Sequence, residues 1–95
     1  MYKIVFHNRA RKKLNKIPLL QANKIEKEID LLLNNPFDNK NHDIKKVKNK
    51  PLTFRCRVGE YRIIYIINRE KKVINIRRIE NREWDYKTLY SFLQF

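Results

Sequence analysis

The sequence predicts one α+β domain over residues 1–95, with an antiparallel sheet and two helices packed on one of its faces. Three observations support this fold class. A chain of 95 residues can bury only one modest core. Its patterns follow the order strand, helix, helix, three strands, helix. The last three strands are joined by tight reversals, which make them antiparallel neighbours.

The first third of the chain holds one strand pattern and two helix patterns. Residues 2–7 alternate loosely between apolar and polar, as a short strand does, and Asn8 can cap the helix that follows. Pro18 suits the first turn of a second helix, which ends near residues 34–36. Its core-facing stripe has helical spacing and comprises Ala22, Ile25, Ile29, Leu32 and Leu33.

The rest of the chain is mostly strand. Residues 35–50 are polar and predict a loop with one extended segment near 44–48. A hairpin follows, turning at 58–61 around Gly59, the only glycine. A second reversal at 68–72 leads to an alternating strand over 73–79, and apolar spacing over 83–95 predicts a closing amphipathic helix.

Charge narrows the function classes. Lysine and arginine number 23 against 10 acidic residues, which gives a net charge of +13 and calls for an anionic partner: nucleic acid, an acidic protein or a membrane surface. The longest apolar run, 63–67, is far shorter than the roughly 20 residues of a membrane-spanning helix. Basic residues follow the first apolar stretch, the reverse of a secretory signal. We therefore expect a soluble, cytoplasmic protein.

Neither the cysteine nor the histidines indicate a cofactor or metal site. Cys56 is the only cysteine, so no intrachain disulfide can form, and we expect it to be a small core residue. His7 and His42 have no further ligands at metal-binding spacing. We expect no metal and no cofactor.

Arginine and lysine are distributed differently. Seven of the nine arginines lie from Arg55 to Arg82, whereas twelve of the fourteen lysines lie outside that interval. Arginine presents a rigid fork that matches phosphate, and lysine is a mobile point charge. The lysines therefore indicate a general field and the arginines a site.

Strand alternation predicts where some of these arginines point. Arg55 and Arg57 share one face of their strand, and the hairpin keeps Arg62 near Arg57, although the register decides which face Arg62 takes. The alternative is a solvated face on which acids neutralise the arginines. The nearby acids are Glu60, Glu80, Glu83 and Asp85.

The segment "FRCRVGEYRIIYII" (54–67) resembles the central segment of toxins of the RelE/ParE superfamily from type II toxin–antitoxin systems. Those toxins place two basic residues before Val-Gly, an acid, Tyr-Arg and an apolar strand. "NPFDNKNHDIKKVKNK" (35–50) is similar to the family's proline-containing loop, and "INIRRIENREWDY" (74–86) resembles its last strand with the following Arg and Tyr. The likeness covers essentially the whole chain and implies the RelE fold.

In the RelE branch, the resemblance implies a ribosome-dependent, metal-independent mRNA endoribonuclease. The messenger's 2′-hydroxyl attacks the adjacent phosphate and leaves a 2′,3′-cyclic phosphate. Arg62, helped by Arg55, would hold the scissile phosphate, and Arg82 would stabilise charge beside the leaving group. Tyr86 would stack on a base, with Tyr90 as its rival. Arg57 matches the second basic position of the hairpin, and the further RNA-binding candidates are Lys46, Lys48, Arg77 and Arg78.

Two departures from the family leave the general base unassigned. Arg57 stands where some relatives have a lysine that can accept a proton, and Asn81 stands where relatives often have a histidine. The resemblance also implies partners: the ribosome, mRNA and an acidic RelB-like antitoxin in a heteromeric complex.

Two other functions remain open. One is a ParE-like poison of DNA gyrase, which uses the same scaffold without the nuclease residues. The other is a basic RNA-binding module that performs no chemistry. The set Arg55, Arg57, Arg62, Arg82 and Tyr86 favours the nuclease.

Overall fold

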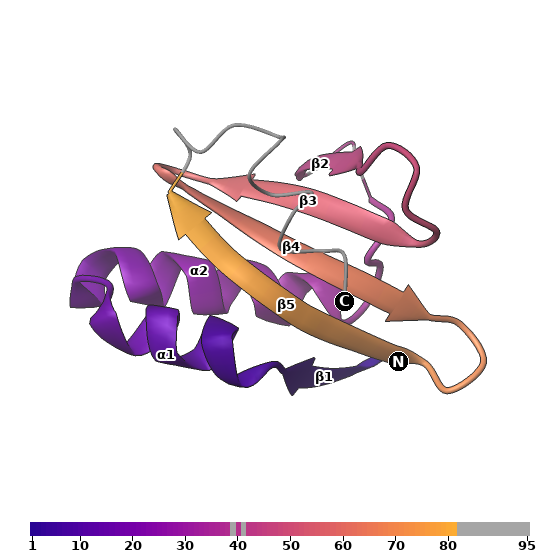
Figure 1. The fold of residues 1–95 in the computed structure, drawn as a ribbon, viewed down its shortest axis with the longest axis horizontal. Coiled ribbons are helices and arrows are strands. Elements are labelled where there is room, and N and C mark those ends of the chain that lie inside the picture. Colours follow the sequence, from indigo (N-terminus) through magenta and orange to yellow (C-terminus); the bar gives the residue numbers. More distant parts are fainter. Residues whose placement is uncertain (39, 41, 82–95) are drawn as a thin grey trace.

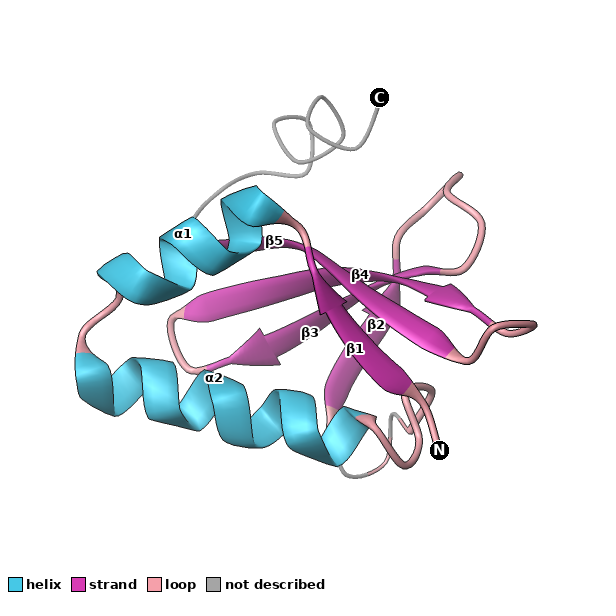
Figure 2. Cartoon of the chain, turned by 90° about the horizontal axis from the view of Figure 1, so that it is seen from below, coloured by secondary structure: helices cyan, strands magenta, loops and turns pink. Residues whose placement is uncertain are grey.

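The computed structural model describes residues 1–38, 40 and 42–81. Two helices lie on one face of a five-stranded sheet, as Figures 1 and 2 show from two directions, and this confirms the predicted α+β class. The elements in chain order are β1 (Lys3–Phe6), α1 (Asn8–Lys16), α2 (Leu19–Leu32), β2 (Asp43–Lys46), β3 (Thr53–Val58), β4 (Tyr61–Asn68) and β5 (Val73–Asn81).

The sheet is mixed, which corrects the prediction of a purely antiparallel sheet. Its strand order is β1-β5-β4-β3-β2, and β1 pairs parallel to β5 while the other neighbours are antiparallel. The antiparallel pairing of β3 with β4 and of β4 with β5 confirms the predicted neighbours. These strands are neighbours because their connections are short. The extended segment expected at 44–48 is the edge strand β2, which begins one residue earlier and ends at Lys46.

The core lies between the helices and the sheet. Ala10 and Leu14 of α1 and Ile25 and Ile29 of α2 are buried against it. The sheet contributes side chains that alternate along its strands, such as Cys56. The others from the central strands are Ile63, Tyr65, Ile67, Ile74, Ile76 and Ile79.

Local chemistry sets the ends of these elements. His7, not Asn8, caps α1, because its Nδ1 accepts a hydrogen bond from the Arg9 backbone N–H at 3.2 Å. The β3–β4 turn has Gly59 at φ +57°, and Glu60 is not among the described residues with positive φ. A positive φ at the first central position only is the pattern of a type II′ hairpin, which glycine accommodates without strain.

A β-bulge interrupts β5. Ile64 of β4 pairs with Arg78, but its neighbour Tyr65 pairs with Ile76, so Arg77 is the extra residue. The bulge changes which residues face the core: Ile74 and Ile76 point inward before it, and Ile79 does so after it. Arg78 and Glu80, which flank Ile79, therefore project from the opposite face.

Candidate functional site: an arginine-rich sheet face

The register places Arg62 on the same sheet face as Arg55 and Arg57. Arg62 lies directly opposite Arg57, and Ile64 lies opposite Arg55, while Cys56 and Ile63 pair on the core side. The side chains of Arg57 and Arg62 are therefore immediate cross-strand neighbours. We call the sheet face turned away from the helices the arginine face; its described charged residues on strands β2 to β5, apart from Arg77 at the bulge, are Asp43, Lys45, Arg55, Arg57, Arg62, Arg78 and Glu80.

One row of paired residues crosses this face through four strands. Asp43 lies opposite Arg57, which is opposite Arg62, and Arg62 is in turn opposite Glu80. The two arginines thus occupy the middle of the row and a carboxylate stands at each end. Like charges directly opposite each other destabilise a sheet by about 0.2 to 1 kcal/mol, and the flanking acids offset that repulsion.

Asp43 joins two of the arginines. Its Oδ1 lies 3.2 Å from Nη1 of Arg55, and its Oδ2 lies 3.7 Å from Nε of Arg57. Arg55 is only 1 % exposed and also donates to the Asp43 carbonyl oxygen at 3.4 Å. Arg57 keeps 37 % of its side-chain surface exposed. Arg55 is thus held inside the structure, whereas Arg57 can reach a ligand.

The other end of the row is organised by Glu80. Its Oε1 forms an ion pair with Nη2 of Arg78 at 3.0 Å, and both side chains are largely buried. Arg77, at the bulge, is half-buried, and burial lowers the pKa of its guanidinium. On the arginine face, four arginines and Lys45 outnumber the two described carboxylates. Among the described residues these two carboxylates do not balance the charge of the face. The alternative of a face neutralised by acids also named Glu83 and Asp85, which lie outside the described residues.

The remaining candidate RNA-binding lysines lie apart from this row. Lys46 pairs with Phe54, so it projects from the opposite face at the sheet edge, and Lys48 follows β2 in an exposed turn. Lys45, which sequence reasoning did not single out, pairs with Arg55 and shares the arginine face. Arg82, Tyr86 and Tyr90 lie outside the described residues.

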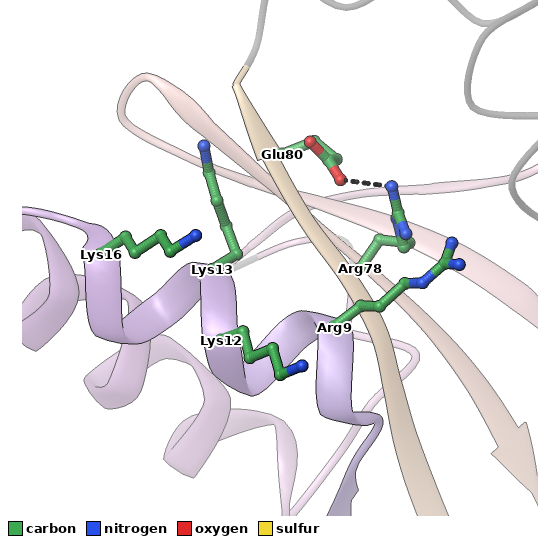
Figure 3. A pocket seen from close by; sticks show the side chains of 6 residues that line it. All are labelled: Arg9, Lys12, Lys13, Lys16, Arg78 and Glu80. Atoms are coloured by element: carbon green, nitrogen blue, oxygen red, sulfur yellow. Dashed lines mark ion pairs between the residues drawn. The ribbon is translucent and has the colours of Figure 1, made fainter.

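A second cationic surface was not foreseen. Four basic residues of α1 stand at helical spacing, and together with Arg78 and Glu80 they line a hollow of about 330 Å³ between α1 and β5 (Figure 3). We call it the α1–β5 groove; its described lining residues are Arg9, Lys12, Lys13, Lys16, Arg78 and Glu80. The spacing of Arg9, Lys12, Lys13 and Lys16 is visible in the sequence, but their position beside the end of β5 follows only from the fold.

Cys56 and His42 have structural contacts. Cys56 is fully buried, and its thiol donates to Glu28 Oε1 at 3.8 Å, while the same oxygen contacts Nδ1 of His42. Burial and the neighbouring Glu28 carboxylate raise the pKa of Cys56 to about 12, so the thiol stays protonated near neutrality. Within the described part of the chain, no three His, Cys, Asp or Glu side chains gather closely enough to hold a metal ion. None of its helices has the length and apolar character to cross a membrane.

The fold and the arginine face define a small, strongly basic α+β protein that carries four arginines on one face of its sheet. The family model for the ParE toxin of the type II toxin–antitoxin system parDE matches residues 4–86. RelE1 of Methanocaldococcus jannaschii, a protein assigned as a toxin, is 31% identical over 86 residues, covering 90% of this chain and 96% of that protein. The chain belongs to the RelE/ParE superfamily of type II toxins, and its likeness to RelE1 marks it as a RelE-family toxin.

Solved structures support the same fold. The chain is similar to RelE in the archaeal RelE–RelB complex from Pyrococcus horikoshii OT3, with a TM-score of 0.78 and 27% identity over 88% of this chain and 98% of that one. RelE of the Methanococcus jannaschii RelB–RelE complex has a TM-score of 0.71 and 29% sequence identity, covering 90% of this chain and 94% of that one. The isolated Escherichia coli RelE toxin has a TM-score of 0.77 at 19% identity, covering 99% of this chain and 98% of that one. At this identity the comparison shows a likeness of fold alone.

Proposed function

We propose that this toxin is a ribosome-dependent, metal-independent endoribonuclease that cuts mRNA and so inhibits translation. The observation that carries the proposal is the cross-strand pair Arg57 and Arg62 on a face where cations outnumber carboxylates, in a RelE-family chain. Two guanidinium groups side by side match the oxygens of one phosphodiester, to which each can donate charge-assisted hydrogen bonds.

The proposed chemistry needs charge stabilisation more than a strong base. The 2′-oxygen of the message attacks the adjacent phosphorus, the bond from phosphorus to the 5′-oxygen breaks, and the 2′-proton passes to solvent while the leaving oxygen gains one. Negative charge builds on the phosphorane oxygens, where preorganised guanidinium donors stabilise it most. Arg62, helped by the exposed Arg57, takes this role.

Arg55 acts differently in this proposal. Because it is buried and bonded to Asp43, it positions the carboxylate that holds Arg57, rather than leading the contact with phosphate. Arg82 and Tyr86 complete the proposed set, with charge stabilisation at the leaving group and base stacking as their roles. Arg77, Arg78, Lys46 and Lys48 contribute to RNA binding through the field around the site.

The test uses translating ribosomes programmed with a defined message, on which new 5′ ends are mapped after toxin is added. We expect cuts on the ribosome and few in free RNA. Arg62→Ala should lower the cleavage rate about 100-fold or more. The matched control is Arg69→Ala, which removes an exposed arginine of the β4–β5 turn. The guanidinium of Arg69 lies over the ring of Phe37. Equal cleavage by Arg62→Ala and wild type would remove the proposal.

A second candidate is a poison of DNA gyrase, because the matching family model describes ParE toxins. The same preparation tested with gyrase and supercoiled DNA separates the two functions. Gyrase-dependent breaks without mRNA cuts would replace the nuclease. Binding of RNA with neither activity would leave the non-catalytic module.

The partner of this toxin is a RelB-like antitoxin in a heteromeric complex, as in the archaeal RelE–RelB structures. With a net charge of +13, the toxin attracts an acidic chain over distance, so association should slow as salt rises. Action on ribosomes implies that the toxin works in the cytoplasm.

A further inference from the structure

The α1–β5 groove has the composition of a phosphate-binding surface. Five of its six described lining residues are cationic, and the sixth, Glu80, is paired with Arg78 at 3.0 Å. Figure 3 shows Arg9 reaching from α1 toward Arg78, with the lysines of α1 bordering the same hollow. Burial, together with the charges of Arg77, Arg9 and Arg78, lowers the pKa of His7 at the start of α1, as expected where cations crowd.

The spacing of these cations suits a chain of charges. Arg9, Lys12, Lys13 and Lys16 follow i, i+3, i+4 and i+7 positions, so they share one side of α1 over about 10 Å. A nucleic-acid backbone presents its phosphates at regular intervals and is bound mainly by such side chains.

The groove is continuous with the arginine face. Glu80 and Arg78 belong to both surfaces, and Glu80 lies directly opposite Arg62. Adjacent strands lie about 5 Å apart, so two strand spacings, about 10 Å, separate the position of Arg57 from that of Glu80. A polyanion held at Arg57 and Arg62 can therefore cross β5 and reach α1 within a few nucleotides.

The composition favours RNA over a protein partner. All described side chains that line the groove are charged, whereas protein interfaces depend on a desolvated apolar centre. Apolar surface that could serve a protein lies elsewhere, on Leu19 and Leu20 of α2, which are 75% and 65% exposed. The hollows beside α2 include apolar side chains such as Leu14 and Ile29.

We propose that the α1–β5 groove binds the backbone of the same single-stranded RNA whose phosphodiester lies at Arg57 and Arg62, several nucleotides away from the reacting bond. This inference rests on the proposed function for the position of the reacting bond. It gives α1 a role in holding the message in register. Contacts at a distance from the reacting bond can be used to orient it.

The test measures binding of 2′-O-methyl oligouridylates, which lack the attacking hydroxyl and cannot be cut. A dinucleotide probe, with one phosphate, can occupy the Arg57–Arg62 pair alone, whereas a probe of about 12 nucleotides also spans the groove. In wild type the longer probe should bind at least about tenfold more tightly. In Lys12→Gln/Lys16→Gln that advantage should fall to about twofold, and the slope of log affinity against log salt should decrease by about 1 to 1.5.

The matched control is Lys24→Gln/Lys27→Gln, which removes two exposed charges from α2. It should leave the length advantage intact. Lys12→Arg/Lys16→Arg should restore binding and shows that charge is the operative property. Thermal unfolding of each variant checks that α1 still packs, since Lys16 lies in its last turn.

Three results would overturn the proposal. Equal losses in the two lysine pairs would mean that the whole field, and no particular groove, binds RNA. Equal losses for the short and long probes would make the groove a separate site. Binding of a poly-glutamate peptide is measured in the same way. If Lys12→Gln/Lys16→Gln weakens the binding of this peptide as much as that of the long RNA probe, or more, the groove is assigned to an acidic protein. Because the probe is not cleaved, these outcomes do not depend on nuclease activity.

Discussion

Asp43→Asn tests whether one carboxylate holds the arginine face together. Asparagine keeps the shape and one acceptor oxygen but removes the charge that Arg55 and Arg57 share. Arg55 is 1 % exposed, so its charge has little solvent to replace the lost partner, whereas Asp43 itself is 46 % exposed. The loss should therefore be smaller than for a fully buried pair.

The distances give the magnitude. Unit charges at 3.2 Å and 3.7 Å attract each other by about 1 to 2.5 kcal/mol per pair at an effective dielectric constant of about 40 to 80. The asparagine oxygen and the Asp43 carbonyl retain part of this interaction with Arg55. We expect a net loss of about 2 kcal/mol in the free energy of unfolding, or about 8 to 16 °C in Tm for a domain of this size.

The assay is urea unfolding with thermal unfolding as a second probe. Glu70→Gln is the control, since it raises the net charge equally at an exposed turn residue and should change stability by less than about 0.5 kcal/mol. A double-mutant cycle with Arg55→Met measures the coupling between the two side chains. The Asp43→Asn loss should be about 1 to 2 kcal/mol smaller in the Arg55→Met background than in wild type. If Asp43→Asn is as stable as Glu70→Gln, the arginine face is not organised by this carboxylate.

The other predictions concern the hairpin, the α1 cap and the thiol. Gly59→Ala should lower the free energy of unfolding by about 1 to 2 kcal/mol in urea, because φ at this position is +57°. No neighbouring atom lies within 4 Å of the added Cβ, so the loss measures backbone strain alone. Gly59→Asn should lose less stability, because asparagine tolerates positive φ better. The pKa of His7 is lowered in the folded state, so its contribution to stability is present above the unfolded-state pKa and is lost as pH falls through the folded-state pKa. His7→Asn, which keeps a capping acceptor, should therefore lose less stability than wild type between about pH 8 and pH 5; parallel pH curves would contradict this. Cys56, with a pKa raised to about 12, should react with iodoacetamide near neutral pH only when urea unfolds the chain, and rapid labelling of the native protein would refute its burial.

Much of the fold could be predicted because local patterns and global packing agree. The stripe of α2 and the turn at Gly59 are each specified by a few neighbouring residues, and the structure has them where expected. The parallel pairing of β1 with β5 could not be predicted this way, since it joins segments about 70 residues apart with no local signature. Likewise, His7 rather than Asn8 caps α1, because both side chains offer an acceptor and the backbone decides.

The sequence predicted that arginines of the hairpin lie together, but it did not predict which carboxylates lie beside them. Sequence placed Arg55 and Arg57 on one face, and the register then added Arg62, as the hairpin spacing suggested. Asp43 was missed because a polar loop gives no register, so its pairing with Arg57 was invisible. The bulge at Arg77 was missed for a related reason: one extra residue reverses the alternation on which face assignments depend, and only the pairing of Arg78 with Ile64 reveals it.

The arrangement of carboxylates explains how so basic a sheet can fold before it meets an anionic partner. Asp43 and Glu80 stand at the two ends of the row through Arg57 and Arg62, where each can lower the repulsion without lying between the two guanidinium groups. An acid at the centre would neutralise the site, and no acid at all would leave the repulsion unopposed. Charge placed at the ends leaves a cationic centre that a phosphate can complete. On this view an anionic partner that binds this face stabilises the toxin, because it binds the folded chain and adds negative charge beside the two guanidinium groups.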